Sequence, residues 1–188
     1  MSQPFEIVIG GLAFPEALRW RAGELWFSDV LAGRVLRLAA QGEVQALARI
    51  QPSCGGLGWL PAGDLLAVDC EGRRLMRLNS NGSMTVHCDL AALWQYPAND
   101  MLVDADGTAW VGSYGFNPEL DEPVASSLMQ VDPAGQVVGQ VDGLVFPNGM
   151  ARIDADHIVV SETFASRLAI VNTAGSPTVV ERIALPEG

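Results

Sequence analysis

A short pattern recurs four times along this 188-residue chain: a turn, an apolar run, and then a second apolar run. The copies begin at Gly23, Gly63, Gly107 and Asp156, so their starts lie 40, 44 and 49 residues apart. Glycine-containing turns separate the runs, and short strands with such punctuation form antiparallel meanders. Units of about 45 residues with four strands each are typical of the blades of a β-propeller.

The repeats therefore predict an all-β fold, a single β-propeller domain that is apparently incomplete. We expect four four-stranded blades over residues 10–50, 51–92, 93–145 and 146–188. A plain β-sandwich is the competing fold, but the regular period favours the propeller. One apolar segment, Phe5 to Ile9, is left over and predicts an extra N-terminal strand that completes a further blade. Leu185 to Gly188 has the composition of a connection toward such a blade.

Composition narrows the possible partners. The formal net charge of −11 argues against nucleic acid, because phosphate groups repel an acidic surface. No apolar run approaches the roughly 18 residues of a membrane-spanning helix, and the N-terminus lacks the basic residue of a secretory signal. We expect no membrane association and a cytoplasmic location. Cys54, Cys70 and Cys88 fit neither a disulfide framework nor a zinc cluster, so we expect buried free thiols.

The repeat also brings distant residues into register. The first residues of the four innermost strands, counted back from the turns, are Glu16, Gly56, Asn99 and Asn148. In a propeller these positions surround one mouth of the central channel. A carboxylate and two amide carbonyls suit a hard cation, calcium first, with Mg²⁺ or Mn²⁺ as substitutes. Zn²⁺ is less favoured, because no thiolate or imidazole shares the register.

Three stretches resemble one protein family. Gly11-Leu12-Ala13-Phe14-Pro15-Glu16, Pro97-Ala98-Asn99-Asp100-Met101 and Pro147-Asn148-Gly149-Met150 are similar, in order and at blade spacing, to motifs of the SMP-30/gluconolactonase/LRE family. The chain departs from the pattern at two points. Ala17-Leu18 stands where the family has Gly-Pro, and Pro97 stands where some gluconolactonases carry a substrate-binding arginine.

The resemblance implies a six-bladed propeller with a divalent metal on its axis. Glu16 and Asn148 match two metal ligands of the family, and Asn99 matches the asparagine beside the metal that also contacts water or substrate. The last ligand, an aspartate that opens the fifth blade and is proposed as the general base, has no match in the chain, so the catalytic residue stays unknown. We expect Tyr114, Phe116 and Glu162 to contact the substrate from the same mouth.

The predicted function is that of a metal-dependent lactonase, a gluconolactonase-like ester hydrolase acting on a small-molecule lactone or ester. A bound cation would polarise the carbonyl and activate water. A non-catalytic binding propeller or an inactive fragment is one alternative, and a phosphotriesterase-like hydrolase is another. The activity of this chain alone is expected to be poor, and open blade edges predict self-association. Residues 116–125, an insertion in the third repeat, predict a lid over the mouth.

Overall fold

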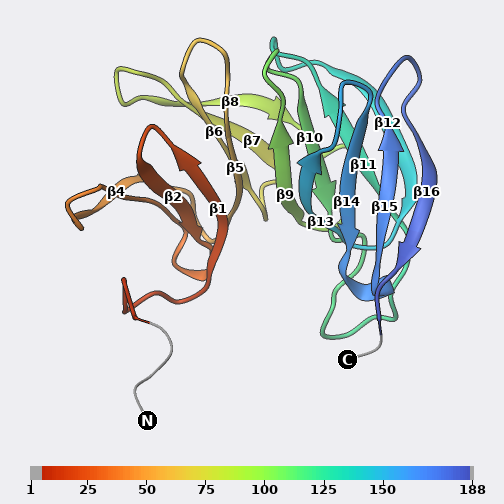
Figure 1. The fold of residues 1–188 in the computed structure, drawn as a ribbon, viewed down its shortest axis with the longest axis horizontal. Helices are drawn as coiled ribbons and strands as arrows, with labels where there is room; N and C mark the ends of the chain where they lie inside the picture. Colours follow the sequence, from red (N-terminus) through yellow and green to blue (C-terminus); the bar gives the residue numbers. More distant parts are fainter. Residues whose placement is uncertain (1–5, 187–188) are drawn as a thin grey trace.

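The computed structural model describes residues 6–186 and places them in sixteen strands, with no α-helix among the described residues. The strands form four antiparallel sheets, each built from four strands consecutive in the sequence (Figure 1). The strands are β1 (Pro15–Arg21), β2 (Glu24–Asp29), β3 (Arg34–Leu38) and β4 (Val44–Arg49) in the first sheet; β5 (Cys54–Trp59), β6 (Leu65–Asp69), β7 (Arg74–Leu78) and β8 (Met84–Asp89) in the second; β9 (Ala98–Val103), β10 (Ala109–Ser113), β11 (Ser126–Val131) and β12 (Val137–Leu144) in the third; and β13 (Pro147–Arg152), β14 (His157–Glu162), β15 (Arg167–Asn172) and β16 (Thr178–Ala184) in the fourth.

The four sheets are propeller blades arranged side by side in an arc (Figure 1). Neighbouring blades meet mainly through their first strands, β1 against β5, β5 against β9, and β9 against β13. The predicted propeller of about four blades is confirmed. One short 3₁₀ turn follows β2 (Val30–Ala32) and another follows β14 (Thr163–Ala165). No described helix has the length and apolarity to cross a bilayer.

Three buried apolar clusters hold successive blades together. Leu57 and Val35 belong to the cluster between the first and second blades, and Met101 belongs to the one between the second and third. Trp110 and Ile158 belong to the cluster between the third and fourth. Within residues 6–186 no such cluster joins the fourth blade to the first, and these two blades stand apart in Figure 1. The described chain is therefore an open arc.

Every first strand carries a β-bulge at the same place. Pro15, Cys54, Ala98 and Pro147 each pair with the last residue of the second strand, and the register shifts directly after them in β5, β9 and β13 and one residue later, after Glu16, in β1. The four residues that follow, Glu16, Gly55, Asn99 and Asn148, are therefore structurally equivalent. This corrects the predicted register, which placed Gly56 in the set. Bulges re-aim side chains, and here they do so where the strands enter the sheets.

One departure from the family pattern, Ala17 in place of glycine, lies within the bulge of β1. Ala17, directly after Glu16, has a φ of 51°. This left-handed conformation favours glycine, the residue that the family carries at this position. The chain keeps the backbone conformation with an alanine, whose methyl group is buried between the first two blades. The side chain of Glu16 thus retains the direction that the bulge gives it.

A buried acid and an arginine close the turn after the second strand in three blades. The pairs are Asp29 with Arg34, Asp69 with Arg74, and Glu162 with Arg167. Each acid lies five residues before its arginine, and the residue preceding the arginine has a positive φ. Two of the acids also bind the chain that enters the first strand. Asp29 accepts hydrogen bonds from the amides of Ala13 and Phe14, at 2.9 and 2.8 Å.

The extra N-terminal strand is not present in the described part of its segment. Residues 6–10 form no ladder, and Ile7 and Val8 are exposed. A strand requires the free N–H and C=O groups of a neighbouring edge, and this segment leaves the first sheet without meeting one (Figure 1). Phe5 lies outside the described residues, as do Glu187 and Gly188 of the predicted connection.

Candidate functional site

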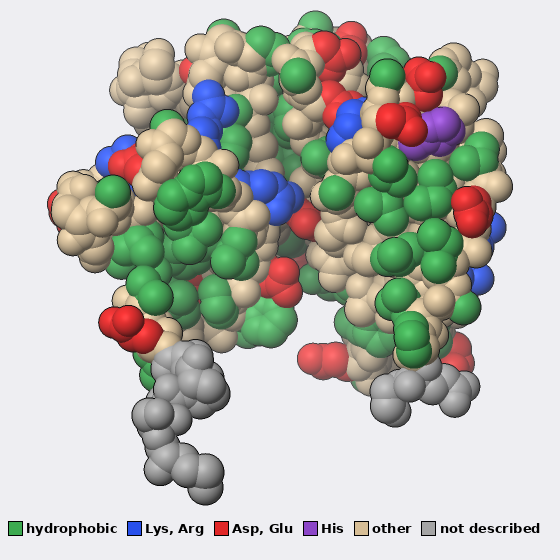
Figure 2. Space-filling view, in the orientation of Figure 1, with side chains coloured by type: hydrophobic (Ala, Val, Ile, Leu, Met, Phe, Trp, Pro, Cys, Tyr) green, Lys and Arg blue, Asp and Glu red, His purple; other side chains and the backbone are tan. Residues whose placement is uncertain are grey.

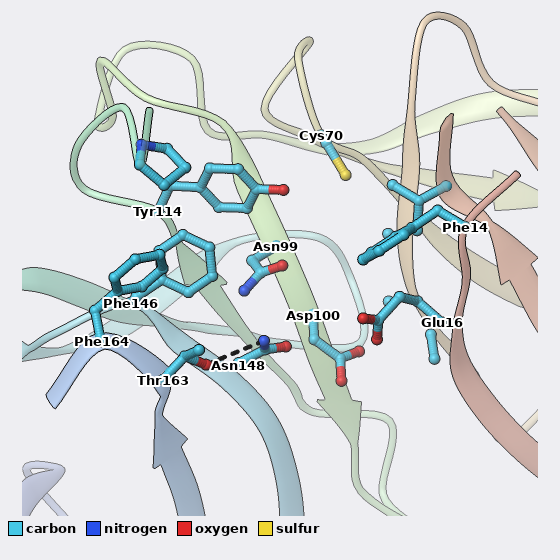
Figure 3. Close-up of a pocket in the computed structure, with 15 residues that line it drawn as sticks. Phe14, Glu16, Cys70, Asn99, Asp100, Tyr114, Phe146, Asn148, Thr163 and Phe164 are labelled. Carbon is cyan, nitrogen blue, oxygen red and sulfur yellow. Dashed lines mark hydrogen bonds between the residues drawn. The ribbon is translucent and has the colours of Figure 1, made fainter. Parts of the chain in front are cut away.

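A cavity of about 310 Å³ opens where β1, β9 and β13 begin (Figure 3). It is lined by residues of all four blades. These are Phe14, Glu16, Ala17, Val30, Gly55, Gly56, Cys70, Asn99, Asp100, Tyr114, Pro118, Phe146, Asn148, Thr163 and Phe164. The predicted metal ligands Glu16, Asn99 and Asn148 thus line one cavity, although 132 positions separate the first from the last.

The three predicted ligands present oxygen atoms to this cavity. Asn99 donates its amide N–H to the carbonyl of Pro147 at 3.1 Å, and Asn148 donates to the hydroxyl of Thr163 at 3.2 Å. Each hydrogen bond directs the amide nitrogen away and leaves the carbonyl oxygen facing the space beside Glu16 (Figure 3). The Glu16 carboxylate accepts no hydrogen bond from the described residues. One carboxylate and two amide oxygens are the donors that Ca²⁺ accepts, with further oxygens from water or substrate.

Residues 6–186 contain no group of three or more His, Cys, Asp or Glu side chains placed to hold a metal ion. A cation at this cavity would therefore depend on the two asparagine oxygens as well as on Glu16. Such a donor set favours a hard cation over zinc.

A second carboxylate, Asp100, borders the cavity beside Glu16 (Figure 3). It is bound to Arg19, which reaches across from β1 and donates to Asp100 Oδ1 at 3.0 Å. The same guanidinium donates to the carbonyls of Met101 and Leu57, at 2.8 and 3.1 Å. Burial raises the pKa of Asp100, and the Arg19 charge and the Met101 amide oppose that rise. The pair joins the first blade to the third directly below the cavity.

Aromatic rings form the opposite side of the cavity. Tyr114, Phe146 and Phe164, which we call the aromatic wall, line it. The ring centroids of Tyr114 and Phe146 lie 4.5 Å apart, and those of Phe146 and Phe164 lie 4.9 Å apart. Burial, followed by the nearby Cys70 and acidic groups, raises the pKa of Tyr114 to about 12, so its hydroxyl is protonated at neutral pH.

Two predicted substrate contacts lie elsewhere. Phe116 is buried behind the aromatic wall, with its ring edge against Phe146 and Phe164 at 5.8 and 5.2 Å. Glu162 is fully buried and does not line the cavity, which corrects its predicted role. Its oxygens accept hydrogen bonds from Arg167, Arg182 and the amide of Val145. A carboxylate with these partners has no free oxygen to offer a ligand.

The sequence contained a signal for this structural role of Glu162. An acid stands five residues before an arginine in three repeats, at Asp29, Asp69 and Glu162.

The predicted lid, the insertion at residues 116–125, lies beside the cavity, because Pro118 is among the lining residues. The Asp121 carboxylate of the insertion accepts hydrogen bonds from the Tyr96 hydroxyl and from the Asn117 backbone amide, and these bonds hold the loop in place.

Sequence reasoning missed Asp100, Phe146 and Phe164 as lining residues. In a regular strand Asp100 would point away from the face that Asn99 uses, because neighbouring side chains alternate. The bulge after Ala98 breaks that alternation and lets both residues border the cavity. Phe164 lies in the turn after the second strand, and the repeat gave no signal for it, because Leu31 at the equivalent position of the first blade does not line the cavity.

Comparisons with known proteins agree with this architecture. A sequence model described as "SMP-30/Gluconolactonase/LRE-like region" matches residues 14–182. No curated protein sequence matches the chain. Among solved structures, a gluconolactonase from Xanthomonas campestris is 21% identical with a TM-score of 0.77, over 96% of this chain and 66% of that one.

Two further structures show the same likeness. A virginiamycin B lyase from Staphylococcus aureus is 17% identical with a TM-score of 0.70, over 93% of this chain and 57% of that one. The calcium-binding protein regucalcin from Agrobacterium tumefaciens strain C58 is 18% identical with a TM-score of 0.69, over 89% and 59%. At these identities the likeness shows the fold. The chain spans less than two thirds of the length of each of these three structures.

Proposed function

Because the chain belongs to the SMP-30/gluconolactonase/LRE-like family, we propose that its cavity binds a divalent cation, calcium first, and hydrolyses a lactone or a related ester. One observation carries the proposal. Glu16, Asn99 and Asn148 come from three different blades, and each directs an unbonded oxygen into the same cavity. A single asparagine in a turn is common for structural reasons alone. Three oxygen donors from three blades at one cavity favour a cation site.

The overall reaction is the addition of water to a cyclic ester. The water oxygen bonds to the carbonyl carbon, the ring C–O bond breaks, and the released alkoxide takes a proton to give one hydroxy acid. A bound divalent cation supplies charge that polarises the carbonyl oxygen and makes a water molecule more acidic. Glu16, Asn99 and Asn148 would hold that cation. The hydrogen bonds from Asn99 to Pro147 and from Asn148 to Thr163 fix both amide groups in the required orientation.

Calcium titration by calorimetry tests the cation site directly. We expect one site, and we expect Glu16→Gln to weaken it about tenfold or more, which corresponds to ~1.4 kcal/mol. The substitution keeps the shape of the side chain and removes its charge. Glu181→Gln is the matched control, because Glu181 is an exposed carboxylate on β16, away from the cavity. Equal calcium affinity in Glu16→Gln and the unsubstituted protein would contradict the proposal.

Lactone hydrolysis in a pH-stat tests the chemistry. Turnover is expected with calcium, is expected to stop with a chelator, and is expected to fall in Glu16→Gln but not in Glu181→Gln. Calcium binding without any turnover would instead favour a binding propeller over an enzyme.

A further inference from the structure

We propose that the substrate carries an apolar substituent, an alkyl chain or an aryl group, which lies against the aromatic wall of Tyr114, Phe146 and Phe164. The inference rests on the proposed function and specifies its substrate class. The cavity has two unlike sides. Its carboxylate and amide oxygens gather at Glu16, Asn99, Asp100 and Asn148, and its rings gather opposite them (Figure 3).

The aromatic wall is a built surface rather than a set of loose side chains. Phe116 supports Phe146 and Phe164 from behind and is itself fully buried. The rings meet in tilted and edge-to-face arrangements, as stable aromatic pairs do. Phe164 is nevertheless 44% exposed, although it borders the cavity. An apolar ring held rigidly at the edge of a cavity is a surface that a ligand can cover.

A second apolar surface faces this wall. Phe14 is 50% exposed and points into the cavity from the side of the first blade (Figure 3). Val30, whose amide donates a hydrogen bond to the Phe14 carbonyl at 2.8 Å, also lines the cavity. A substituent on the lactone ring would therefore lie between Phe14 of the first blade and the aromatic wall, which the third and fourth blades contribute. Its carbonyl would remain at the oxygen side, near Glu16 and the two asparagines.

The backbone supports the same interpretation. Phe146 has a φ of 51°, a left-handed conformation that is strained for a bulky residue. The strain occurs two residues before Asn148, and it places the ring in the wall between Tyr114 and Phe164. Strained residues of this kind cluster at ligand-binding sites.

The polar groups of the cavity do not suit a polyhydroxylated ring. No Lys or Arg side chain is among the lining residues, and the Thr163 hydroxyl already accepts a hydrogen bond from Asn148. The aromatic wall offers the hydroxyl of Tyr114 as its only polar side-chain group. Sugar hydroxyls placed against the wall would lose water without gaining partners, which disfavours their binding. An alkyl chain placed there would gain about threefold to fourfold in affinity for each buried methylene.

Calorimetry with lactams, which resemble lactones but resist hydrolysis, tests this inference. With saturating calcium we expect δ-valerolactam to bind weakly, its 6-butyl derivative to bind at least about tenfold more tightly, and a polyhydroxylated lactam to gain nothing. Phe164→Ala should remove most of the gain from the butyl group, and Phe164→Leu should keep part of it. Leu31→Ala is the matched control, because Leu31 occupies the equivalent position in the first blade and does not line the cavity.

The outcomes separate the two proposals. If calcium and the parent lactam bind but the butyl group adds no affinity, the substrate class is wrong while the proposed function stands. If neither calcium nor any lactam binds, the proposed function itself fails. Thermal melts of each variant show whether it is folded, and Phe164→Leu provides a second test if Phe164→Ala does not fold.

Discussion

Among single residues, Arg19 and Asp100 form an ion pair beside the cavity. Asp100 borders the cavity and lies beside Glu16, so two carboxylates share a small space (Figure 3). The Arg19 guanidinium binds the Asp100 carboxylate and three backbone carbonyls, and so it neutralises negative charge beside the proposed cation site. Because neither charged side chain is more than 26% exposed, solvent compensates little for the loss of one partner.

We expect Arg19→Met to lower the free energy of unfolding by about 3 kcal/mol, because it leaves the buried Asp100 carboxylate unpaired. Asp100→Asn in the same chain should recover much of this loss, and a double-mutant cycle in urea measures the coupling. Added calcium should stabilise Arg19→Met more than the unsubstituted protein, since a cation can replace the lost charge. Arg21→Met is the control, because the exposed Arg21 only stacks on Trp59. If the stability losses of Arg19→Met and Asp100→Asn simply add in the double variant, the Arg19–Asp100 ion pair does not stabilise the protein.

Among the elements of the fold, the acid–arginine turns position the strands that carry the cavity residues. Glu162 holds the amide of Val145, three residues before Asn148, and Asp29 holds the amides of Ala13 and Phe14, just before Glu16. Burial alone would raise the pKa of both carboxyls. Hydrogen bonds from the backbone and from Arg34 or Arg167 outweigh that effect and hold both pKa values below their ordinary values.

These lowered pKa values predict acid sensitivity. A carboxyl whose pKa is lower in the folded state stabilises the protein above its unfolded pKa, and loses that contribution as the pH falls through the folded value. The contribution of Glu162 is therefore fully present above its ordinary pKa of 4.5 and is lost below it. We expect Glu162→Gln to be less stable than the unsubstituted protein at pH 7 and to show a shallower loss of stability below pH 4.5.

Urea unfolding between pH 7 and pH 3 measures this difference. Glu24→Gln is the control, because Glu24 pairs with Arg37 at a partly exposed site and its loss should cost about 1 kcal/mol or less. Parallel pH profiles for Glu162→Gln and the unsubstituted protein would show that the acid in the turn does not contribute to stability through its charge.

Over the molecule as a whole, the described chain is an open arc in which the first and fourth blades each lack a neighbouring blade on one side. Figure 2 shows hydrophobic side chains gathered on the first sheet, at the left, and on the fourth sheet, at the right. Leu18 and Trp20 of β1 are 58% and 73% exposed, and Ile153 and Ile183 of the fourth blade are also exposed. Large apolar side chains gathered on an exposed face mark an interaction site.

We expect the 188-residue chain to self-associate at micromolar concentrations through these faces. Sedimentation velocity should show oligomers, and Trp20→Glu should shift the population toward the monomer because a charge cannot be buried there without a partner. Val86→Glu is the control, since Val86 is half exposed on the outer strand β8 of the second blade. A monomer at every concentration would contradict the prediction.

The architecture and the three oxygen donors of the cavity, Glu16, Asn99 and Asn148, follow from the amino-acid sequence. The turn spacing identified the four-stranded units, because each blade is local in sequence and its hairpins need glycine at the same places. The same spacing brought Glu16, Asn99 and Asn148 into register, since each stands at the start of a first strand. Cys54, Cys70 and Cys88 are buried free thiols, as predicted.

Packing between strands settled which neighbours of those residues face the cavity. The β-bulges break the alternation of side chains along β1, β5, β9 and β13, and so they place Gly55 in the register and Asp100 at the cavity. The partners of Glu162 determined its role, because Arg182 lies on another strand and Val145 lies in another turn. Periodicity describes a regular strand, whereas bulges and long-range hydrogen bonds arise only when separate strands pack against one another.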